Sequence, residues 1–204
     1  TKQLSKHCIK QILVFIRQPA LRQLLLTFFC FELAWSLYYQ GMAVIGVQKF
    51  HLSRVNVGYL SAYIGLSLSV GLLFVLRLVV RYFSLKQIIR LSLWLASGCF
   101  IIGFLATDLS LQLLLAIPIT FAIATGYCSL ITAMSDLTLA PEQGLLMGTT
   151  DAVLSLAFAI TGFLSGWLTL HHPMLPLLAS ALFMGAGLIL YKKTKQRLLF
   201  EQTK

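Results

Sequence analysis

The chain has 204 residues, of which 58% are hydrophobic, and its mean hydropathy is +0.87. This composition excludes a water-soluble globular domain. The formal net charge of +10 does not indicate a nucleic-acid-binding protein, because the basic residues lie at the ends of apolar segments and do not form a patch on a soluble fold.

Six long apolar segments fill most of the chain. Each has about 18–27 residues, and a helix of that length crosses a hydrocarbon core about 30 Å thick. The sequence therefore predicts an all-α polytopic membrane protein with six transmembrane helices. The predicted helices are Leu21–Val47, Val57–Val80, Ile88–Ala106, Leu111–Ser135, Leu145–Leu170 and Met174–Tyr191.

Both ends of the chain are basic. In residues 1–20, apolar residues recur at helical spacing between basic ones, which predicts an amphipathic cytoplasmic helix that lies on the membrane and leads into the first span. Residues 192–204 form a basic cytoplasmic tail after the bundle of residues 21–191, and the short connections leave no room for a soluble domain. Because the chain begins with Thr1 and not with Met, we expect it to be a fragment of a longer protein.

The basic residues predict the orientation. If both termini lie in the cytoplasm, only Lys49 and Arg54 of the 16 Lys and Arg residues fall on the outer side. Cytoplasmic loops of membrane proteins are enriched in Lys and Arg. We therefore expect cytoplasmic N- and C-termini, the inner membrane of a bacterium as the location, and contact of the basic residues with membrane lipids.

Polar side chains are concentrated in three of the predicted helices. The first, fourth and fifth carry several of them within the apolar segment, whereas the third and sixth are almost purely apolar between their ends. This contrast predicts functional faces on the first, fourth and fifth helices and supporting, lipid-facing roles for the third and sixth. The two triplets of helices have similar lengths and must run in opposite orientations, which predicts two inverted three-helix repeats of the kind found in secondary transporters.

Two runs of sequence resemble parts of one transporter family. Phe31–Leu66 (FELAWSLYYQGMAVIGVQKFHLSRVNVGYLSAYIGL) is similar to the seventh helix, outer loop and eighth helix of major facilitator superfamily transporters. Ser135–Leu168 (SDLTLAPEQGLLMGTTDAVLSLAFAITGFLSGWL) is similar to the junction of the tenth and eleventh helices of drug-efflux-type members, where a Pro-Glu-x-x-Gly-like turn precedes a Gly-rich helix. The whole chain thus resembles the C-terminal six-helix half of such a transporter.

The resemblance implies a secondary active transporter that works by alternating access, in which this bundle rocks against an N-terminal six-helix half of the same protein. It implies that the first, second, fourth and fifth helices line the central cavity. It also implies proton-coupled export of a small molecule, with protons and this substrate as partners and with no cofactor. The connection Arg77–Arg90, expected as a loop, occupies the place of a family signature of which only the basic residues remain.

Glu32 is the leading candidate for a functional residue. It lies roughly 12–17 Å along the first helix, near the bilayer midplane, where a carboxylate costs about 2.5 kcal/mol or more. Trp35 and Tyr39 share its helix face, and Tyr127 and Gln40 are further candidates for stacking on a substrate or hydrogen-bonding to it. We hypothesise that Glu32 binds and releases a proton, or meets a cationic substrate. The alternative is a protonated Glu32 that is hydrogen-bonded for helix packing.

Asp151 lies about 10 Å into the fifth helix, on a face of small residues. Small residues at GxxxG spacing let helices approach closely. Two interpretations stay open: Asp151 forms an interhelical hydrogen bond in a packing seam, or it belongs to a cytoplasmic gate or proton path. The glycines of this face are Gly144, Gly148, Gly162 and Gly166.

Asp136 ends the fourth helix on the side of the membrane where the second helix carries Arg77 and Arg81. We hypothesise that these charges form a cytoplasmic gate, in which Asp136 pairs with one of the arginines and the pair breaks as the two halves rock. The alternative is that each long side chain reaches the interface alone.

Nothing in the sequence supports a metal site, a cofactor or an enzyme. The four Cys residues show no paired spacing, and the four His residues form no ligand cluster. An intramembrane protease would need a Gly-x-Ser-Gly nucleophile and an embedded His, and an aspartate-rich lipid synthase would need clustered Asp residues. The remaining alternative is a self-contained six-helix channel or carrier that acts as a homodimer.

Overall fold

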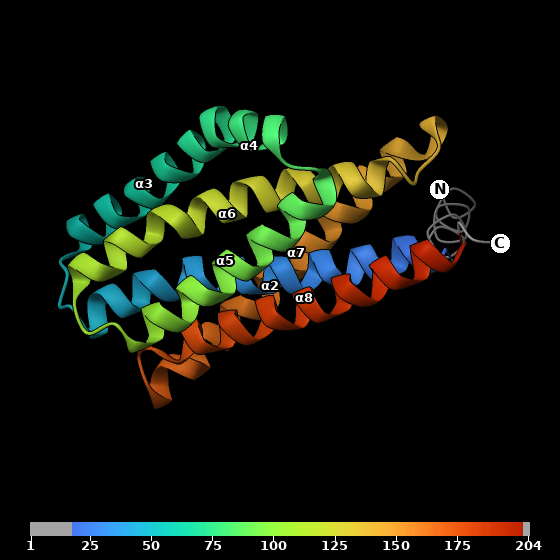
Figure 1. Ribbon diagram of the computed structural model, residues 1–204. Coiled ribbons are helices and arrows are strands. Elements are labelled where there is room, and N and C mark those ends of the chain that lie inside the picture. The colour runs from blue at the N-terminus through green and yellow to red at the C-terminus, as the bar shows by residue number, and fades with distance from the viewer. Residues whose placement is uncertain (1–17, 202–204) are drawn as a thin grey trace.

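The computed structural model describes residues 18–201 and the side chains of residues 18–193. It has six helices that are long and apolar enough to span a membrane, and no strand within residues 18–201. The predicted all-α polytopic membrane fold is therefore confirmed. The elements are α2 (Pro19–Gln48), α3 (Arg54–Val70), η1 (Gly71–Val75), α4 (Leu76–Tyr82), α5 (Leu85–Leu105), α6 (Leu109–Ser135), η2 (Ala140–Glu142), α7 (Gln143–His171) and α8 (Leu175–Glu201) (Figure 1).

The first and last helices of the bundle are longer than the spans predicted for them. The amphipathic helix predicted over residues 1–20 lies almost entirely outside the described residues. α2 begins at Pro19, a residue that suits the first turn of a helix because it has no N–H to leave unbonded. α8 continues ten residues beyond the predicted end of its span, to Glu201, so the basic tail is largely helical in the described part of the chain.

The second predicted span contains a π-helical turn, η1, between α3 and α4. Gly71 begins this turn against α6, where a Cβ atom at Gly71 would lie 3.0 Å from the Cβ of Ala124 and 3.2 Å from the ring of Phe121. A π turn bends the helix that contains it. After the bend, α4 buries none of its side chains. The second span therefore packs closely on α6 as far as η1 and then diverges from it (Figure 1).

The prediction of a loop over Arg77–Arg90 is wrong, because only Phe83 and Ser84 separate α4 from α5. The missed signal is the spacing of Ser84 and Gln87, which is that of a helix capping box. The side-chain oxygen of Gln87 accepts a hydrogen bond from the backbone N–H of Ser84 at 2.9 Å. Arg and Lys favour helix about as well as Leu does, so a run of basic residues did not mark a loop.

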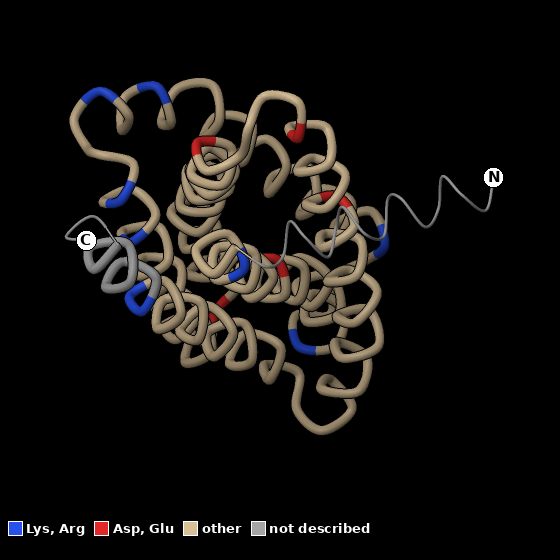
Figure 2. Tube along the Cα trace, turned by 90° about the vertical axis from the view of Figure 1, so that its right-hand side faces the viewer, with Lys and Arg blue, Asp and Glu red and all other residues tan. Residues whose placement is uncertain are grey.

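α2 and α6 are the two helices around which the others pack. α2 packs along α7 and α8, α6 packs along α3 and α5, and α5 also packs along α8. Figure 2 looks along the bundle from the end where α2 begins and α8 ends. α2 buries a full stripe of large side chains, which includes Leu21, Phe28, Phe31, Leu37 and Ile45.

α3 and α7 flank the bundle and are its most exposed spans. A smaller share of their apolar length is buried than in α5 and α8, which are the third and sixth predicted spans. The expectation that the third and sixth helices are the outer supports is therefore not met within this chain. Lipid tails are as apolar as a protein core, so a purely apolar helix such as α5 can pack between α6 and α8 just as it can face lipid.

Candidate functional site

A small cavity lies where α2, α6, α7 and the second span meet. Its volume is about 170 Å³. α2 contributes Glu32 and Trp35, α6 contributes Tyr127, and the remaining side chains are aliphatic. The lining residues are Glu32, Trp35, Leu68, Leu72, Ile123, Ala124, Tyr127 and Leu154.

The carboxyl group of Glu32 has no partner in this cavity. The residue is 1% exposed, and neither side-chain oxygen has a hydrogen-bond partner among the described residues. An unpaired charge taken out of water costs several kcal/mol, so this group requires either a proton or a positively charged ligand. The packing interpretation of Glu32 needs a hydrogen bond to another helix, and the described residues supply none.

Aromatic rings stand beside Glu32. Trp35 and Tyr127 line the cavity with it. The ring of Tyr127 lies 5.8 Å from that of Phe28, and the ring of Trp35 lies 5.8 Å from that of Tyr39. Tyr39 is 38% exposed and does not line the cavity. The structure thus brings Glu32, Trp35 and Tyr127 together, and the faces of such rings attract cations.

Gln40 belongs to a hydrogen-bond chain that joins α2 to α7. Its side-chain nitrogen donates to the hydroxyl of Thr161 at 2.9 Å. The Thr161 hydroxyl lies 2.9 Å from that of Ser36 and can donate to it, and Ser36 donates to the backbone carbonyl of Glu32 at 2.6 Å. This series of hydrogen bonds therefore joins α7 to the segment of α2 that carries Glu32. The sequence shows these polar residues but not that they meet.

The variant Thr161→Val tests whether these hydrogen bonds hold α2 and α7 together. Removal of the hydroxyl leaves the Gln40 amide and Ser36 without their shared partner, and we expect a loss of about 1 kcal/mol in the free energy of unfolding, the usual size for hydrogen bonds between membrane helices. Thr169→Val is the matched control, because the Thr169 hydroxyl bonds, among the described residues, only to carbonyls of its own helix. Unfolding in mixed micelles measures both; equal losses in the two variants would contradict a role in joining the helices.

The glycine face of α7 points away from the bundle. Within the described part of the chain, a Cβ atom at Gly144, Gly148 or Gly166 would have no neighbour within 4 Å, and one at Gly162 would approach only Gln40, at 3.3 Å. Asp151, on the same face, is exposed. α7 packs instead through a buried stripe of small and hydroxyl-bearing residues, Thr150, Ala157, Thr161, Ser165 and Thr169. Both interpretations of the glycine face stay predictions, because any helix that packs on it lies outside the described residues.

Asp136 has no ion pair with Arg77 or Arg81 among the described residues. All three side chains are exposed, and Asp136 directly follows the last residue of α6. This arrangement is the one expected when each side chain reaches the interface alone. The cytoplasmic gate stays a prediction for another conformation of the protein.

Among the described side chains, those of residues 18–193, there is no group of three or more His, Cys, Asp and Glu residues that could hold a metal ion. Besides Glu32, three polar side-chain atoms are buried without a hydrogen-bond partner among the described residues: Oε1 of Gln23 and the hydroxyl oxygens of Tyr38 and Ser129. The chain matches no protein-family model, and no curated protein sequence matches it. The resemblance to the major facilitator superfamily therefore stays a prediction.

Proposed function

We propose that this chain is the C-terminal six-helix bundle of a secondary active transporter of the major facilitator type, which exports a small molecule in exchange for protons by alternating access. The observation that carries the proposal is the unpartnered Glu32 in its cavity between α2, the second span, α6 and α7. An ionisable group within a membrane span is costly and is usually kept for function. These are also the four helices that the family resemblance assigns to a transport cavity.

The packing of the helices supports an inverted repeat. α2 packs along α7 and α8, and α6 packs along the second span and α5. In an inverted repeat, α2 corresponds to α6, the second span to α7, and α5 to α8. When corresponding helices are exchanged, the pairs that α2 forms become the pairs that α6 forms, and the pair of α5 and α8 is unchanged. This is the relation expected of two triplets about a two-fold axis in the membrane plane.

The exposed flanks support a missing partner bundle. α3 and α7 are the least buried spans, and α7 presents an outward stripe of glycines that permits close approach of another helix. In the proposed transporter, the N-terminal half covers these flanks and completes the cavity. The second copy in a homodimeric carrier would use the same faces, so this observation alone does not separate the two.

We further propose an inner-membrane location with both termini in the cytoplasm. α2 begins and α8 ends at the same end of the bundle, as an even number of spans requires (Figure 1). The excess of Lys and Arg at this end supports the cytoplasmic side.

Two measurements test the proposal. The first is the mass of the native protein, detected with an antibody against residues 192–204; a band near twice 22.7 kDa supports a second half, and a band at 22.7 kDa supports the homodimer. The second uses vesicles that contain the native protein, ethidium as a cationic probe and a proton gradient. We expect ethidium to move uphill and to stop when a protonophore is added. Fluxes of ethidium and protons equal to those of empty vesicles would contradict proton-coupled export of a cation.

A further inference from the structure

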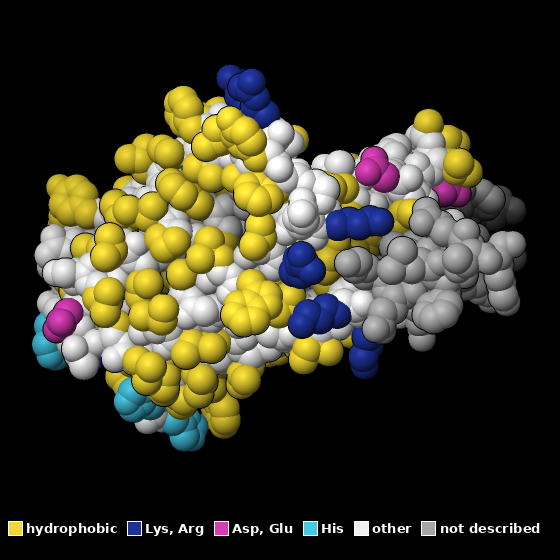
Figure 3. All heavy atoms as spheres, in the orientation of Figure 1, with side chains coloured by type: hydrophobic (Ala, Val, Ile, Leu, Met, Phe, Trp, Pro, Cys, Tyr) yellow, Lys and Arg dark blue, Asp and Glu magenta, His cyan; other side chains and the backbone are white. Residues whose placement is uncertain are grey.

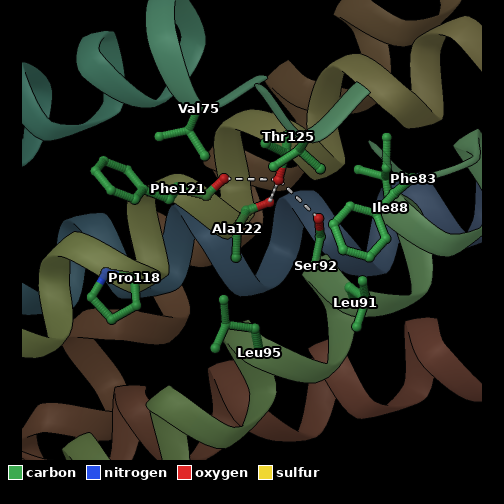
Figure 4. A pocket seen from close by; sticks show the side chains of 11 residues that line it. Val75, Phe83, Ile88, Leu91, Ser92, Leu95, Pro118, Phe121, Ala122 and Thr125 are labelled. Atoms are coloured by element: carbon green, nitrogen blue, oxygen red, sulfur yellow. Dashed lines mark hydrogen bonds between the residues drawn. The ribbon is translucent and has the colours of Figure 1, made fainter. Parts of the chain in front are cut away.

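A second and larger cavity, a groove that is open to the outside of the bundle, lies between α4, α5 and α6. Its volume is about 380 Å³, and it is separate from the Glu32 cavity. Figure 4 shows side chains that face this space, among them Val75 of η1, Phe83 of the connection between α4 and α5, Leu95 of α5, and Pro118 and Phe121 of α6. The hollow exists because the second span diverges from α6 after η1, so that α4 stands off from α5 and α6 and buries no side chain of its own.

The wall of this groove offers no free hydrogen-bond donor. Its two hydroxyls, on Ser92 and Thr125, lie 3.0 Å apart. When Ser92 donates to Thr125, the Thr125 proton is free to bond the carbonyl of Phe121, at 2.8 Å (Figure 4). Both protons are then used within the protein. Every other lining side chain is apolar, so the groove suits a hydrocarbon and not a polar molecule.

The groove opens outward, where a lipid can enter it. Phe83, Leu91 and Leu95 line the groove and are 44%, 49% and 48% exposed. Figure 3 shows a broad hydrophobic face, with most of the dark blue Lys and Arg side chains toward the end beside the grey atoms, where magenta Asp and Glu side chains also lie. An apolar hollow on such a face is filled by whatever surrounds the bundle, and in a membrane that is lipid.

Basic side chains adjoin the end of the groove where α4 meets α5. Phe83, in the connection itself, and Ile88, in the first turns of α5, both line the groove. Arg81 and Lys86, each two residues away along the chain, are exposed. The chain contains no acidic residue between Glu32 and Asp108, so no carboxylate on α3, α4 or α5 neutralises them. Asp136 and Glu142, in the connection from α6 to α7, lie on the same side of the membrane, but the basic residues Arg77, Arg81, Lys86 and Arg90 outnumber them. This end therefore has a net positive charge and lies where a span leaves the membrane, at the level of lipid headgroups.

We propose that the groove between α4, α5 and α6 binds one anionic phospholipid of the surrounding bilayer, with an acyl chain in the hollow and the headgroup phosphate at Arg81 and Lys86. The positive charge of Arg81 and Lys86 selects an anionic headgroup over a zwitterionic one, and the apolar groove holds the acyl chain. The bound lipid fills the space that the π turn opens and joins α4 to α5 and α6. This inference does not depend on the transport function proposed above.

Native mass spectrometry of the full chain in a nonionic detergent tests the site. The delipidated protein is titrated with phosphatidylglycerol or with phosphatidylcholine that has the same acyl chains. We expect one phosphatidylglycerol molecule to bind about tenfold more tightly than the next and than phosphatidylcholine, since the two basic residues attract an anionic headgroup and not a zwitterionic one. Equal affinities for the two lipids, or a series of equivalent sites, would overturn the proposal.

Two sets of variants separate the headgroup from the chain. Arg81→Gln with Lys86→Gln should remove the preference for phosphatidylglycerol and leave the weak binding of phosphatidylcholine unchanged. The control is Lys192→Gln with Lys193→Gln, which removes the same charge from α8, outside the groove. Leu95→Trp should fill the groove and weaken the binding of both lipids, whereas Leu182→Trp, on an exposed position of α8 outside the groove, should not. Because Leu95 is half exposed, its variant retains the fold and keeps the test valid if the charge variants do not fold.

A competition experiment distinguishes a site for a whole phospholipid from a site for a free phosphate ion. Inorganic phosphate at the same concentration should not displace phosphatidylglycerol, because the acyl chain supplies much of the affinity. Displacement by phosphate, or wild-type lipid binding by both Leu95→Trp and the charge variant, would show that the groove does not hold the lipid.

Discussion

Glu32→Gln is expected to reduce proton-coupled transport by the native protein to the level of empty vesicles while the bundle remains folded. Gln has the size and shape of a protonated Glu but takes up and releases no proton. It also has no charge with which to attract a cationic substrate. The measurement is the ethidium flux driven by a proton gradient, compared between wild type and variant at equal protein content.

The stability of the same variant separates a functional role from a structural one. Glu32 has no hydrogen-bond partner among the described residues, so its replacement breaks no contact between helices. We therefore expect the free energy of unfolding to stay at the wild-type value or to rise, as is usual when a functional buried ionisable group is removed. A large loss of stability would instead support the packing interpretation.

Glu142→Gln is the matched control for both measurements. It makes the same chemical change in the short turn before α7, outside the cavity, and should leave flux and stability unchanged. Wild-type flux and coupling in Glu32→Gln would contradict the role of Glu32 in the proposed function. Loss of flux in both variants would point to a general effect of negative charge and not to the cavity.

Much of the fold follows from the sequence because the bilayer imposes a simple rule. A span must be apolar and helical over about 20 residues. Four of the six predicted segments lie wholly within helices of the structure, and the other two extend one residue beyond them, at Ala106 and at Met174. Glu32 was found by the same rule, since a charge within such a segment is conspicuous. The rule says nothing about bends, so the π turn at Gly71 was not predicted.

The orientation of each helix about its own axis was harder to predict. In water, apolar residues mark the buried face, but in a membrane the exposed face is apolar too. α7 illustrates this: Phe163 and Trp167 are exposed, whereas Thr161 and Ser165 are buried. The glycine spacing suggested a packing seam on the opposite side. The chain from Gln40 through Thr161 to Ser36 joins residues more than one hundred positions apart, and no local pattern reveals such a contact.

Gly41→Ala is expected to destabilise the bundle by about 1–3 kcal/mol, the usual cost of overpacking. A Cβ atom at Gly41 would lie 2.7 Å from the Cβ of Pro176, well inside van der Waals contact. Pro176 lies in the first turn of α8, and its rigid ring has no rotamer into which it can withdraw. The two helices must therefore move apart, and α2 packs along α8 over most of its length.

Gly98→Ala gives the comparison that isolates this contact. Gly98 lies in the interior of α5, and a Cβ atom there would have no neighbour within 4 Å. Ala favours helix over Gly by up to about 1 kcal/mol, so Gly98→Ala should be neutral or stabilising. The same gain in helix propensity acts at Gly41, and the difference between the two variants therefore measures the clash with Pro176. Unfolding of both variants in the same mixed micelles gives this difference; equal stabilities would mean that α2 and α8 do not approach as closely as the structure places them. Because α2 carries Glu32, Gly41→Ala should lower transport as well as stability. Glu32→Gln, in contrast, should lower transport without a loss of stability.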